Sequence, residues 1–100
     1  MNESPWTIHI APRVRKQLER IGDRAVVGRL KKAVERLSST PYNGKALTAH
    51  PGVRSLRVGT SGGEYRVLYT VKEADHAVLV VMIGPREDIY ALLGRSGIVP

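Results

Sequence analysis

Arginine and tyrosine side chains gather in the second half of the sequence, within and beside segments that alternate like strands. They are Arg54, Arg57, Tyr65, Arg66, Arg86 and Tyr90. Guanidinium groups match phosphate oxygens in a bidentate geometry and stay charged at any working pH. Neighbouring antiparallel strands lie about 5 Å apart and would bring such side chains together. We interpret the group as a phosphate-binding surface; a solvated basic sheet face without a ligand is the alternative.

Upstream of these residues, the sequence predicts one strand followed by a helical hairpin. Trp6–Ile10 alternates as a strand does. Pro12 suits the first position of a helix, because the N–H that it lacks would be unpaired there. Gly22 is a stop signal for that helix, and Asp23 is an N-cap for the next one. The expected apolar faces are Val14, Leu18 and Ile21 in the first helix, and Val26 or Val27, Leu30, Ala33, Val34 and Leu37 in the second.

Downstream, the pattern predicts a loop, three strands and a short helix. Residues 38–52 are rich in Ser, Thr, Pro, Asn and Gly, which is typical of a loop. The last strand is almost wholly apolar, so we expect it near the centre of the sheet. Glu87–Leu93 predicts a terminal helix that Gly94 closes. The three strands are expected at residues 53–59, 64–71 and 77–83.

This order of elements predicts an α+β domain of two layers, in which a helical hairpin covers one face of a three-stranded antiparallel meander. One hundred residues is the size of one domain. We therefore expect a single domain over residues 1–100, with its core at about 6–93. A double-stranded RNA-binding domain is a natural rival for a small basic chain. That domain begins with a helix and ends with one packed across its sheet, so the order here argues against it.

The charge balance narrows the class of partner. Sixteen Lys and Arg residues against nine Asp and Glu give a formal charge of +7. Such an excess favours nucleic acids, acidic proteins or anionic membranes. No apolar run approaches the ~20 residues that a membrane span needs. The first residues also lack the pattern of a signal peptide, so we expect a cytoplasmic protein.

The sequence lacks the residues or motifs of several kinds of structural and catalytic site. There are no cysteines, so disulfides and thiolate metal sites are excluded. His9, His50 and His76 fall in a predicted strand, a loop and a turn, and nothing places two of them on one face. We therefore expect no metal site. A Walker-type phosphate loop and a nucleophile elbow are also missing.

Three motifs resemble those of the RelE/ParE superfamily of bacterial toxins. Gly44–Leu47 resembles the superfamily's GK-x-L loop. Leu56–Gly59 followed by Glu64–Tyr69 is similar to its R-x-G-(D/E)-Y-R-(V/L)-x-Y hairpin. Ile83–Tyr90 is similar to its closing I-G-H-R-x-x-(V/I)-Y. Together with the opening strand and the basic hairpin, the resemblance covers about residues 6–91, with the motifs in the right order and spacing.

The resemblance implies a compact α+β fold and a cognate antitoxin encoded beside the toxin. A RelB-like, acidic antitoxin would suit a chain of charge +7. In the RelE branch, the resemblance implies cleavage of mRNA in the ribosomal A site, so that the ribosome and mRNA are partners. Operator DNA would be bound only through the antitoxin. No metal or other cofactor is implied, because in these toxins the RNA 2′-hydroxyl attacks the adjacent phosphodiester and the 5′-oxygen leaves.

Carried over by these motifs, the resemblance assigns catalysis to Arg57, Arg66, Arg86 and Tyr90. The arginines would stabilise the charge of the phosphorane transition state. Tyr90 would stack on a base or transfer a proton; an aromatic side chain that merely closes the edge of the core is the alternative. The residues expected to bind RNA are Lys45, Arg54 and Tyr65.

The sequence departs from the superfamily's pattern in three places. Ser55 stands where well-known members of the RelE branch have a second basic residue, so a lysine base is missing there. Pro85 replaces a histidine that often precedes the closing arginine. The turn before Tyr65 is longer than in many members, with Ser61–Gly63 between the strands. Because of the first departure, Tyr90 or a more distant group must act as base, and we expect slower cleavage or a different target.

Other functions fit the same resemblance or the same charge. A member of the ParE branch would share the fold and inhibit DNA gyrase by protein–protein binding. The pair Arg86 and Tyr90 argues against that branch, whose members commonly lack the full catalytic set. A toxin whose chemistry has decayed would form only the antitoxin complex. A general RNA-binding module would use the arginines without any chemistry.

Overall fold

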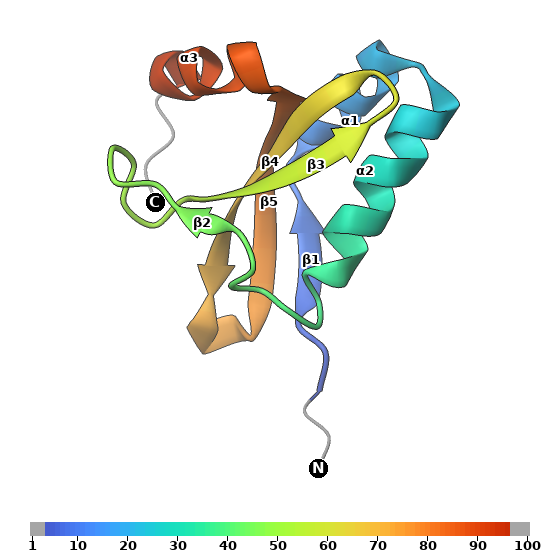
Figure 1. The fold of residues 1–100 in the computed structure, drawn as a ribbon. Helices are drawn as coiled ribbons and strands as arrows, with labels where there is room; N and C mark the ends of the chain where they lie inside the picture. The colour runs from blue at the N-terminus through green and yellow to red at the C-terminus, as the bar shows by residue number, and fades with distance from the viewer. Residues whose placement is uncertain (1–3, 97–100) are drawn as a thin grey trace.

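The structure is a computed structural model that describes residues 4–96. Its elements follow the order predicted from the sequence, which confirms the α+β class (Figure 1). Their bounds are β1 Thr7–Ile10, α1 Pro12–Ile21, α2 Arg24–Arg36, β2 Lys45–Ala46, β3 Arg54–Thr60, β4 Gly63–Lys72, a 3-10 turn Glu73–Asp75, β5 Ala77–Pro85 and α3 Arg86–Ser96.

The five strands form one mixed sheet in the order β1-β5-β4-β3-β2. The predicted meander β3-β4-β5 is antiparallel, whereas β1 pairs in parallel with β5 at one edge. The apolar β5 is an interior strand, as its pattern predicts, although β4 occupies the middle of the sheet. The register of β3 and β4 sets Arg57 directly opposite Arg66.

The helical hairpin packs on one face of the sheet. Gly22 ends α1 in the left-handed conformation with φ 70°. The carboxylate of Asp23 then accepts hydrogen bonds from the backbone N–H groups of Ala25 and Val26 at 2.9 and 3.2 Å, so both predicted helix signals are confirmed. Of the two valines left open by the pattern, Val26 is the buried one. The core beneath the hairpin comprises Val14, Val26, Leu30, Val34, Leu37, Val58, Val67, Tyr69, Val78, Val80 and Ile83.

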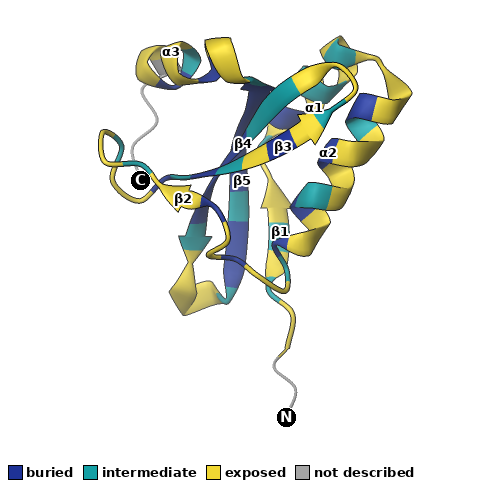
Figure 2. Ribbon diagram, in the orientation of Figure 1, coloured by how far each residue is buried: buried dark blue, intermediate teal, exposed yellow. Residues whose placement is uncertain are grey.

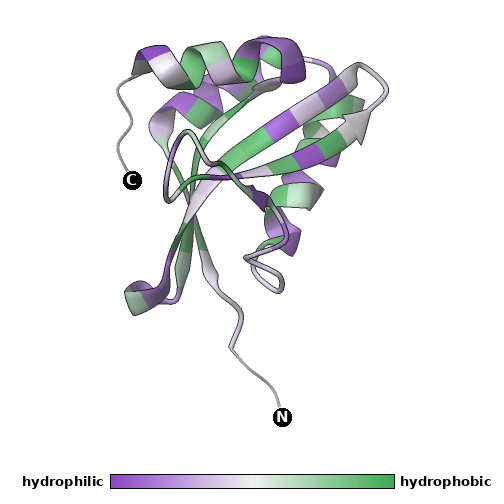
Figure 3. Cartoon of the chain, turned by 60° about the vertical axis from the view of Figure 1, so that its left-hand side comes forward, coloured by the Kyte–Doolittle hydropathy of each residue, from purple (hydrophilic) through white to green (hydrophobic). Residues whose placement is uncertain are grey.

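The terminal helix α3 lies on the opposite face, at one end of the sheet. Its Ile89 and Leu93 are buried against Leu68 of β4 and Met82 of β5. The buried residues are therefore concentrated where β4 and β5 lie between the helical hairpin on one face and α3 on the other (Figure 2). The hydropathy colouring follows the same division, with apolar stretches along the strands and polar ones alternating with them on the helices (Figure 3).

The helix α3 is longer than predicted, because Gly94 does not end it. The helix continues to Ser96, and Gly94 keeps a helical rather than a left-handed backbone. A glycine within a helix costs only about 0.5–1 kcal/mol relative to alanine. This cost is small, so the glycine does not stop the helix before Ser96.

Two further expectations about the loops are wrong. The predicted loop 38–52 contains the short strand β2, whose Lys45 and Ala46 pair with Ser55 and Arg54 of β3. The turn between β3 and β4 is also tighter than predicted, since Thr60 pairs with Gly63 and only Ser61 and Gly62 lie between them. The φ of Gly63, 111°, explains why this position needs glycine. Within residues 4–96, no helix is long and apolar enough to cross a membrane.

Candidate active site

The centre of the site is a pair of arginines on neighbouring strands. Arg57 of β3 and Arg66 of β4 face each other in register, on the side of the sheet that α3 covers. The Arg57 side chain is 71% exposed, whereas that of Arg66 is 19% exposed. Two cations directly opposite one another on antiparallel strands repel. An anion close by would therefore relieve their repulsion.

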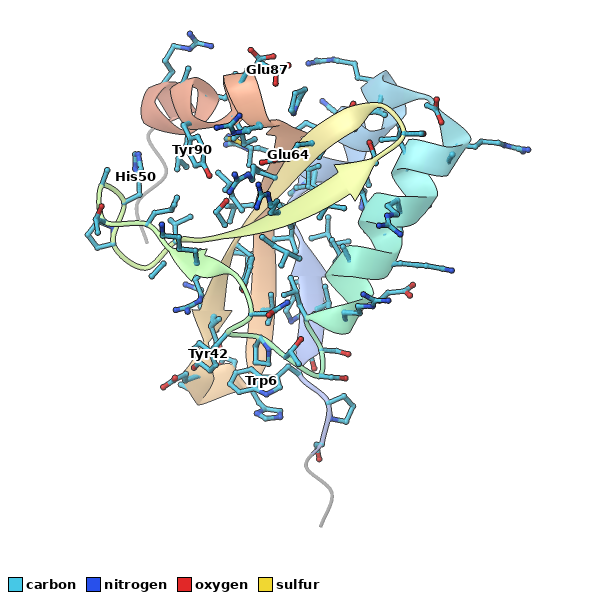
Figure 4. The ribbon with its side chains drawn as sticks, viewed as in Figure 1. Trp6, Tyr42, His50, Glu64, Glu87 and Tyr90 are labelled. Atoms are coloured by element: carbon cyan, nitrogen blue, oxygen red, sulfur yellow. The ribbon has the colours of Figure 1, made fainter. Side chains whose placement is uncertain are left out.

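Glu64 is that anion, and it joins three of the predicted arginines. Its Oε1 lies 3.2 Å from Nε of Arg57, and its Oε2 lies 2.8 Å from Nε and 2.7 Å from Nη2 of Arg66. The same Oε2 lies 3.7 Å from Nε of Arg86. We call these four side chains the arginine cluster. Figure 4 shows Glu64 and Tyr90 in the space below α3.

The electrostatic state of Glu64 follows from these contacts. Burial alone would raise the pKa of the Glu64 carboxyl. Hydrogen bonds from Arg66 and Arg57, together with the charges of both, outweigh burial and hold the pKa below its usual value of 4.5. Glu64 is therefore ionised at neutral pH, and the cluster as a whole keeps an excess of two positive charges.

The junction of β5 and α3 positions the other two predicted catalytic residues. Arg86 is the first residue of α3, and Tyr90 follows it by one helical turn. The burial of Ile89 fixes the rotation of the helix, which leaves Tyr90 38% exposed. The hydroxyl of Tyr90 lies 2.9 Å from Oγ of Ser55. Ser55 is a buried residue, only 3% exposed. Ser55 thus fixes the Tyr90 hydroxyl at the edge of the arginine cluster.

Lys45 borders the same site from the edge strand. It pairs with Ser55 in the register of β2 and β3. A shallow groove runs past it to the arginine cluster and is lined by Asn43, Lys45, Ser55, Leu56, Arg57 and Arg66. The structure therefore places an exposed ammonium group beside the position at which Ser55 replaces a basic residue.

A buried side chain of β4 holds the segment that begins the short strand β2. The buried hydroxyl of Tyr69 accepts a hydrogen bond of 2.7 Å from the backbone N–H of Gly44. Burial raises the pKa of Tyr69, and the hydrogen bond from Gly44 partly offsets this effect. A Cβ on Gly44 would lie 2.7 Å from that hydroxyl, so only glycine allows this close approach. The GKAL segment is thereby fixed next to the site.

Two of the residues predicted to bind RNA do not join the arginine cluster. The Arg54 side chain donates to the backbone carbonyls of Gly44 and Tyr42 at 2.9 and 3.3 Å and lies 5.2 Å from the centre of the Tyr42 ring. Tyr65 is half-buried and packs against the core beneath the helical hairpin. Both lie on the other face of their strands, because successive side chains of a strand alternate.

The end of the sheet away from α3 carries a separate aromatic group. The rings of Trp6 and His76 stack with their centres 4.1 Å apart, and the Tyr42 ring meets Trp6 edge-on at 6.1 Å (Figure 4). The Tyr42 hydroxyl donates a hydrogen bond to Glu73, which raises the pKa of Tyr42. His76 is therefore part of a packing contact. Among the described residues, no three His, Asp or Glu side chains come together in a way that could hold a metal ion.

Sequence reasoning missed Glu64 as a functional residue. Its signal was present in the quoted Glu64–Tyr69 motif, where an acid stands two residues before Arg66 on the same face of the strand. A single carboxylate among several arginines on paired strands is the expected partner of their charges. Chemically, the arrangement can bind a small oxyanion between three guanidinium groups, with a phenolic hydroxyl at its edge.

Comparisons with known proteins agree with the geometry. A family model described as the ParE toxin of type II toxin–antitoxin system, parDE, matches residues 8–90. The free E. coli toxin RelE, carrying two arginine-to-alanine substitutions, superposes with a TM-score of 0.72 at 20% identity, covering 94% of this chain and 99% of that one. No curated protein matches the chain significantly.

Two solved complexes contain similar chains. One is the toxin–antitoxin complex RelBE2 of Mycobacterium tuberculosis, with a TM-score of 0.72 and 23% identity over 87% of this chain and 98% of that one. The other is the intact E. coli RelBE complex, with a TM-score of 0.64 and 26% identity over 80% of this chain and 95% of that one. The match to the family model covers most of the sequence, and the fold is that of RelE toxins. The chain therefore belongs to the RelE/ParE superfamily, as a toxin of a type II toxin–antitoxin system.

Proposed function

We propose that this toxin is a ribosome-dependent mRNA endonuclease that needs no metal. The observation that carries the proposal is the convergence of Arg57, Arg66 and Arg86 on one carboxylate, with the Tyr90 hydroxyl at the edge of the group. A carboxylate and a phosphodiester each carry one negative charge over two oxygens. The site that holds Glu64 is thus suited to a phosphodiester of RNA.

The reaction is a transfer within the RNA backbone. The 2′-oxygen forms a bond to phosphorus and loses its proton, while the bond from phosphorus to the 5′-oxygen breaks and that oxygen gains a proton. The products are a 2′,3′-cyclic phosphate and a free 5′-hydroxyl. Negative charge grows on the non-bridging oxygens in the transition state, and Arg66 and Arg86 are placed to stabilise it, with Arg57 as a third donor.

Tyr90 is the proposed group for proton transfer. Tyr90 is 38% exposed, and its hydroxyl is held at 2.9 Å from Oγ of Ser55, so that the position of the hydroxyl is fixed. Lys45, across the groove, would hold the RNA backbone on the side of β2. Arg54 and Tyr65 take no part in this proposal, because they point away from the cluster.

The partners follow from the superfamily and the charge. A RelB-like, acidic antitoxin would neutralise the toxin by covering α3 or the arginine cluster, and either contact would block the site. The solved RelBE complexes each pair a toxin of similar fold with an antitoxin. The ribosome would present the mRNA, and operator DNA would be reached only through the antitoxin.

The first experiment compares the wild-type chain with Arg86→Ala in a bacterial host that lacks the antitoxin. Growth should stop with the wild type, and new 5′ ends should appear within translated messages only. The variant should lose both effects, because it removes one of three charges at the phosphate. Growth arrest without new 5′ ends would refute the nuclease.

A second comparison tests the role of Tyr90 with two variants that break the same hydrogen bond. Tyr90→Phe should lower the cleavage rate by about 10²–10⁴-fold, the usual contribution of general acid–base catalysis. Ser55→Ala removes only the partner of the hydroxyl and should cost less than about tenfold. Equal losses in the two variants would show that Tyr90 serves packing or positioning rather than proton transfer.

Inhibition of DNA gyrase by protein–protein binding is the second candidate function. It is favoured by the family model, which describes the ParE toxin, and by Ser55 at a position that is basic in well-known RelE members. This function predicts a DNA-damage response on induction while translation continues. It also predicts that Tyr90→Phe stays toxic, because no proton is transferred.

A further inference from the structure

A second basic groove lies between α2 and β3, outside the proposed catalytic group. Its cationic side chains are Arg29, Lys32 and Arg36 of α2 and Arg57 of β3. Its floor is formed by apolar residues, among them Leu37 and Val58. None of the described residues that line it is acidic. Nothing in the proposed chemistry uses the three cations of α2.

The spacing of these cations makes one stripe along the helix. Arg29, Lys32 and Arg36 follow each other by three and four positions, which places them on the same face of α2. From Arg29 to Arg36 the helix rises by about 10 Å. Successive phosphates of one strand advance by ~3.4 Å along the helix axis and lie farther apart than that in space, so the stripe is long enough to face about two of them.

One of the three cations is fixed in position. Nε of Arg29 donates a hydrogen bond of 2.9 Å to the backbone carbonyl of Gly59 in β3. A guanidinium has five N–H donors, and this bond uses one of them. Arg29 therefore ties α2 to the strand and still offers charge to the groove, while Lys32 and Arg36 are exposed side chains beside it.

Arg57 connects the groove to the arginine cluster. It lines the groove of α2 and also the groove that contains Lys45, Ser55 and Arg66. Its side chain is bonded to Glu64 at 3.2 Å on the cluster side. Among the described residues, neither groove is lined by an acidic side chain, so Arg57 marks the point at which a polyanion would pass from one groove to the other.

We propose that the groove between α2 and β3 binds the sugar–phosphate backbone of single-stranded RNA next to the phosphodiester held by the arginine cluster. The inference rests on the proposed function, since the RNA is the substrate of that site. We expect the groove to recognise the charge and shape of the backbone rather than the bases, because most of its polar side chains are cations of the kind that contact phosphates, beside the neutral Thr40 and Asn43. With this groove, the toxin would contact several phosphates of the RNA instead of one.

The test measures binding of an RNA that cannot be cut. The full chain is titrated with a fully 2′-O-methylated RNA of about ten nucleotides, and with the 2′-O-methylated dinucleotide, at several salt concentrations. The groove variant is Lys32→Gln/Arg36→Gln, and the matched control is Arg13→Gln/Lys16→Gln on α1, which removes the same two kinds of charge outside the groove. Thermal unfolding verifies that both variants fold.

For the longer RNA, the groove variant should bind about tenfold more weakly than the wild type. The slope of log affinity against log salt should fall by about 1.4, which corresponds to two phosphate contacts of ~0.7 each. The control should lose much less affinity and keep most of the slope. The dinucleotide should bind all three proteins alike, because it fills only the arginine cluster.

Equal losses in the groove variant and the control, or a loss that also affects the dinucleotide, would overturn the inference, because general charge would then account for binding. An unchanged RNA affinity combined with weaker binding of the acidic antitoxin would assign the groove to the protein partner and also overturn it. The two proposals fail separately. A wild type that cuts messages although its RNA affinity ignores Lys32 and Arg36 refutes only the groove, and groove-dependent binding without cuts refutes only the nuclease.

Discussion

At the scale of single residues, Glu64 occupies the position that the substrate is proposed to take. Its two oxygens contact Arg57 and Arg66 at hydrogen-bonding distance and approach Arg86. The free toxin thereby keeps its arginines close together without their full mutual repulsion. A phosphodiester that enters the cluster must share or replace these contacts, so Glu64 has to release some of its bonds when RNA binds.

This role of Glu64 predicts a pH-dependent stability. Because the pKa of Glu64 is lowered in the folded chain, its contribution to the free energy of unfolding is present above the unfolded value of about 4.5 and disappears as the pH falls through the folded value. Glu64→Gln should therefore be less stable than the wild type at neutral pH, and the difference should close in acid. Denaturant unfolding at a series of pH values measures it. A difference that stays constant from about pH 7 down to pH 2 would show that Glu64 does not stabilise the fold through its charge.

The sequence allowed most of the arginine cluster to be predicted, for a physical reason. Residues on antiparallel neighbours come together when their strands pair in register, and the closing motif places a residue of α3 at the end of β5. The phase of each strand was harder to predict, because β3 carries arginines on both faces. Arg54 and Tyr65 therefore lie away from the cluster, although they are in the same two strands as Arg57 and Arg66.

At the scale of elements, β2 depends on the close contact between the backbone of Gly44 and the Tyr69 hydroxyl, which only glycine permits. Gly44→Ala would place a Cβ 2.7 Å from the Tyr69 hydroxyl and 3.1 Å from the backbone of Ser55. We expect it to lower the free energy of unfolding by about 1–3 kcal/mol, the usual cost of overpacking. Gly28→Ala is the control, since nothing lies within 4 Å of its Cβ and alanine favours a helix by about 0.5–1 kcal/mol. Denaturant unfolding should thus give opposite signs, and a Gly44→Ala protein as stable as the wild type would contradict the role assigned to this contact.

The strand β2 also marks the limit of what a pattern predicts. Two residues have no measurable period, and they become a strand only because β3 supplies their hydrogen-bonding partners. In contrast, α1 and α2 were predicted closely, because Pro12, Gly22 and Asp23 act locally at the helix ends. Local signals determine the hairpin, whereas pairing with β3 determines β2, and α3 continues past Gly94 because a glycine within a helix costs little.

At the scale of the whole molecule, the charge of +7 sets how partners approach. Association with an acidic antitoxin should be accelerated by electrostatic attraction, which salt screens. We expect the association rate constant to fall about tenfold or more between roughly 0.05 and 0.5 M salt, with a smaller change in the dissociation rate. Stopped-flow mixing of the toxin with the proposed acidic antitoxin measures both rate constants. An association rate that ignores salt would show that charge does not guide the encounter.

The parallel pairing of β1 with β5 has a consequence for how the chain matures during its synthesis. Thr7 pairs with Ala77, seventy positions later, so the first strand must wait for the last one before it can be incorporated. The helical hairpin can form locally in the meantime, but contacts between distant parts of a chain slow folding. Arg86 and Tyr90 are also made after β5. A nascent chain whose β5 and α3 have not yet been made therefore has no assembled arginine cluster, and the ribosome that makes it meets the finished site only after the sheet has closed.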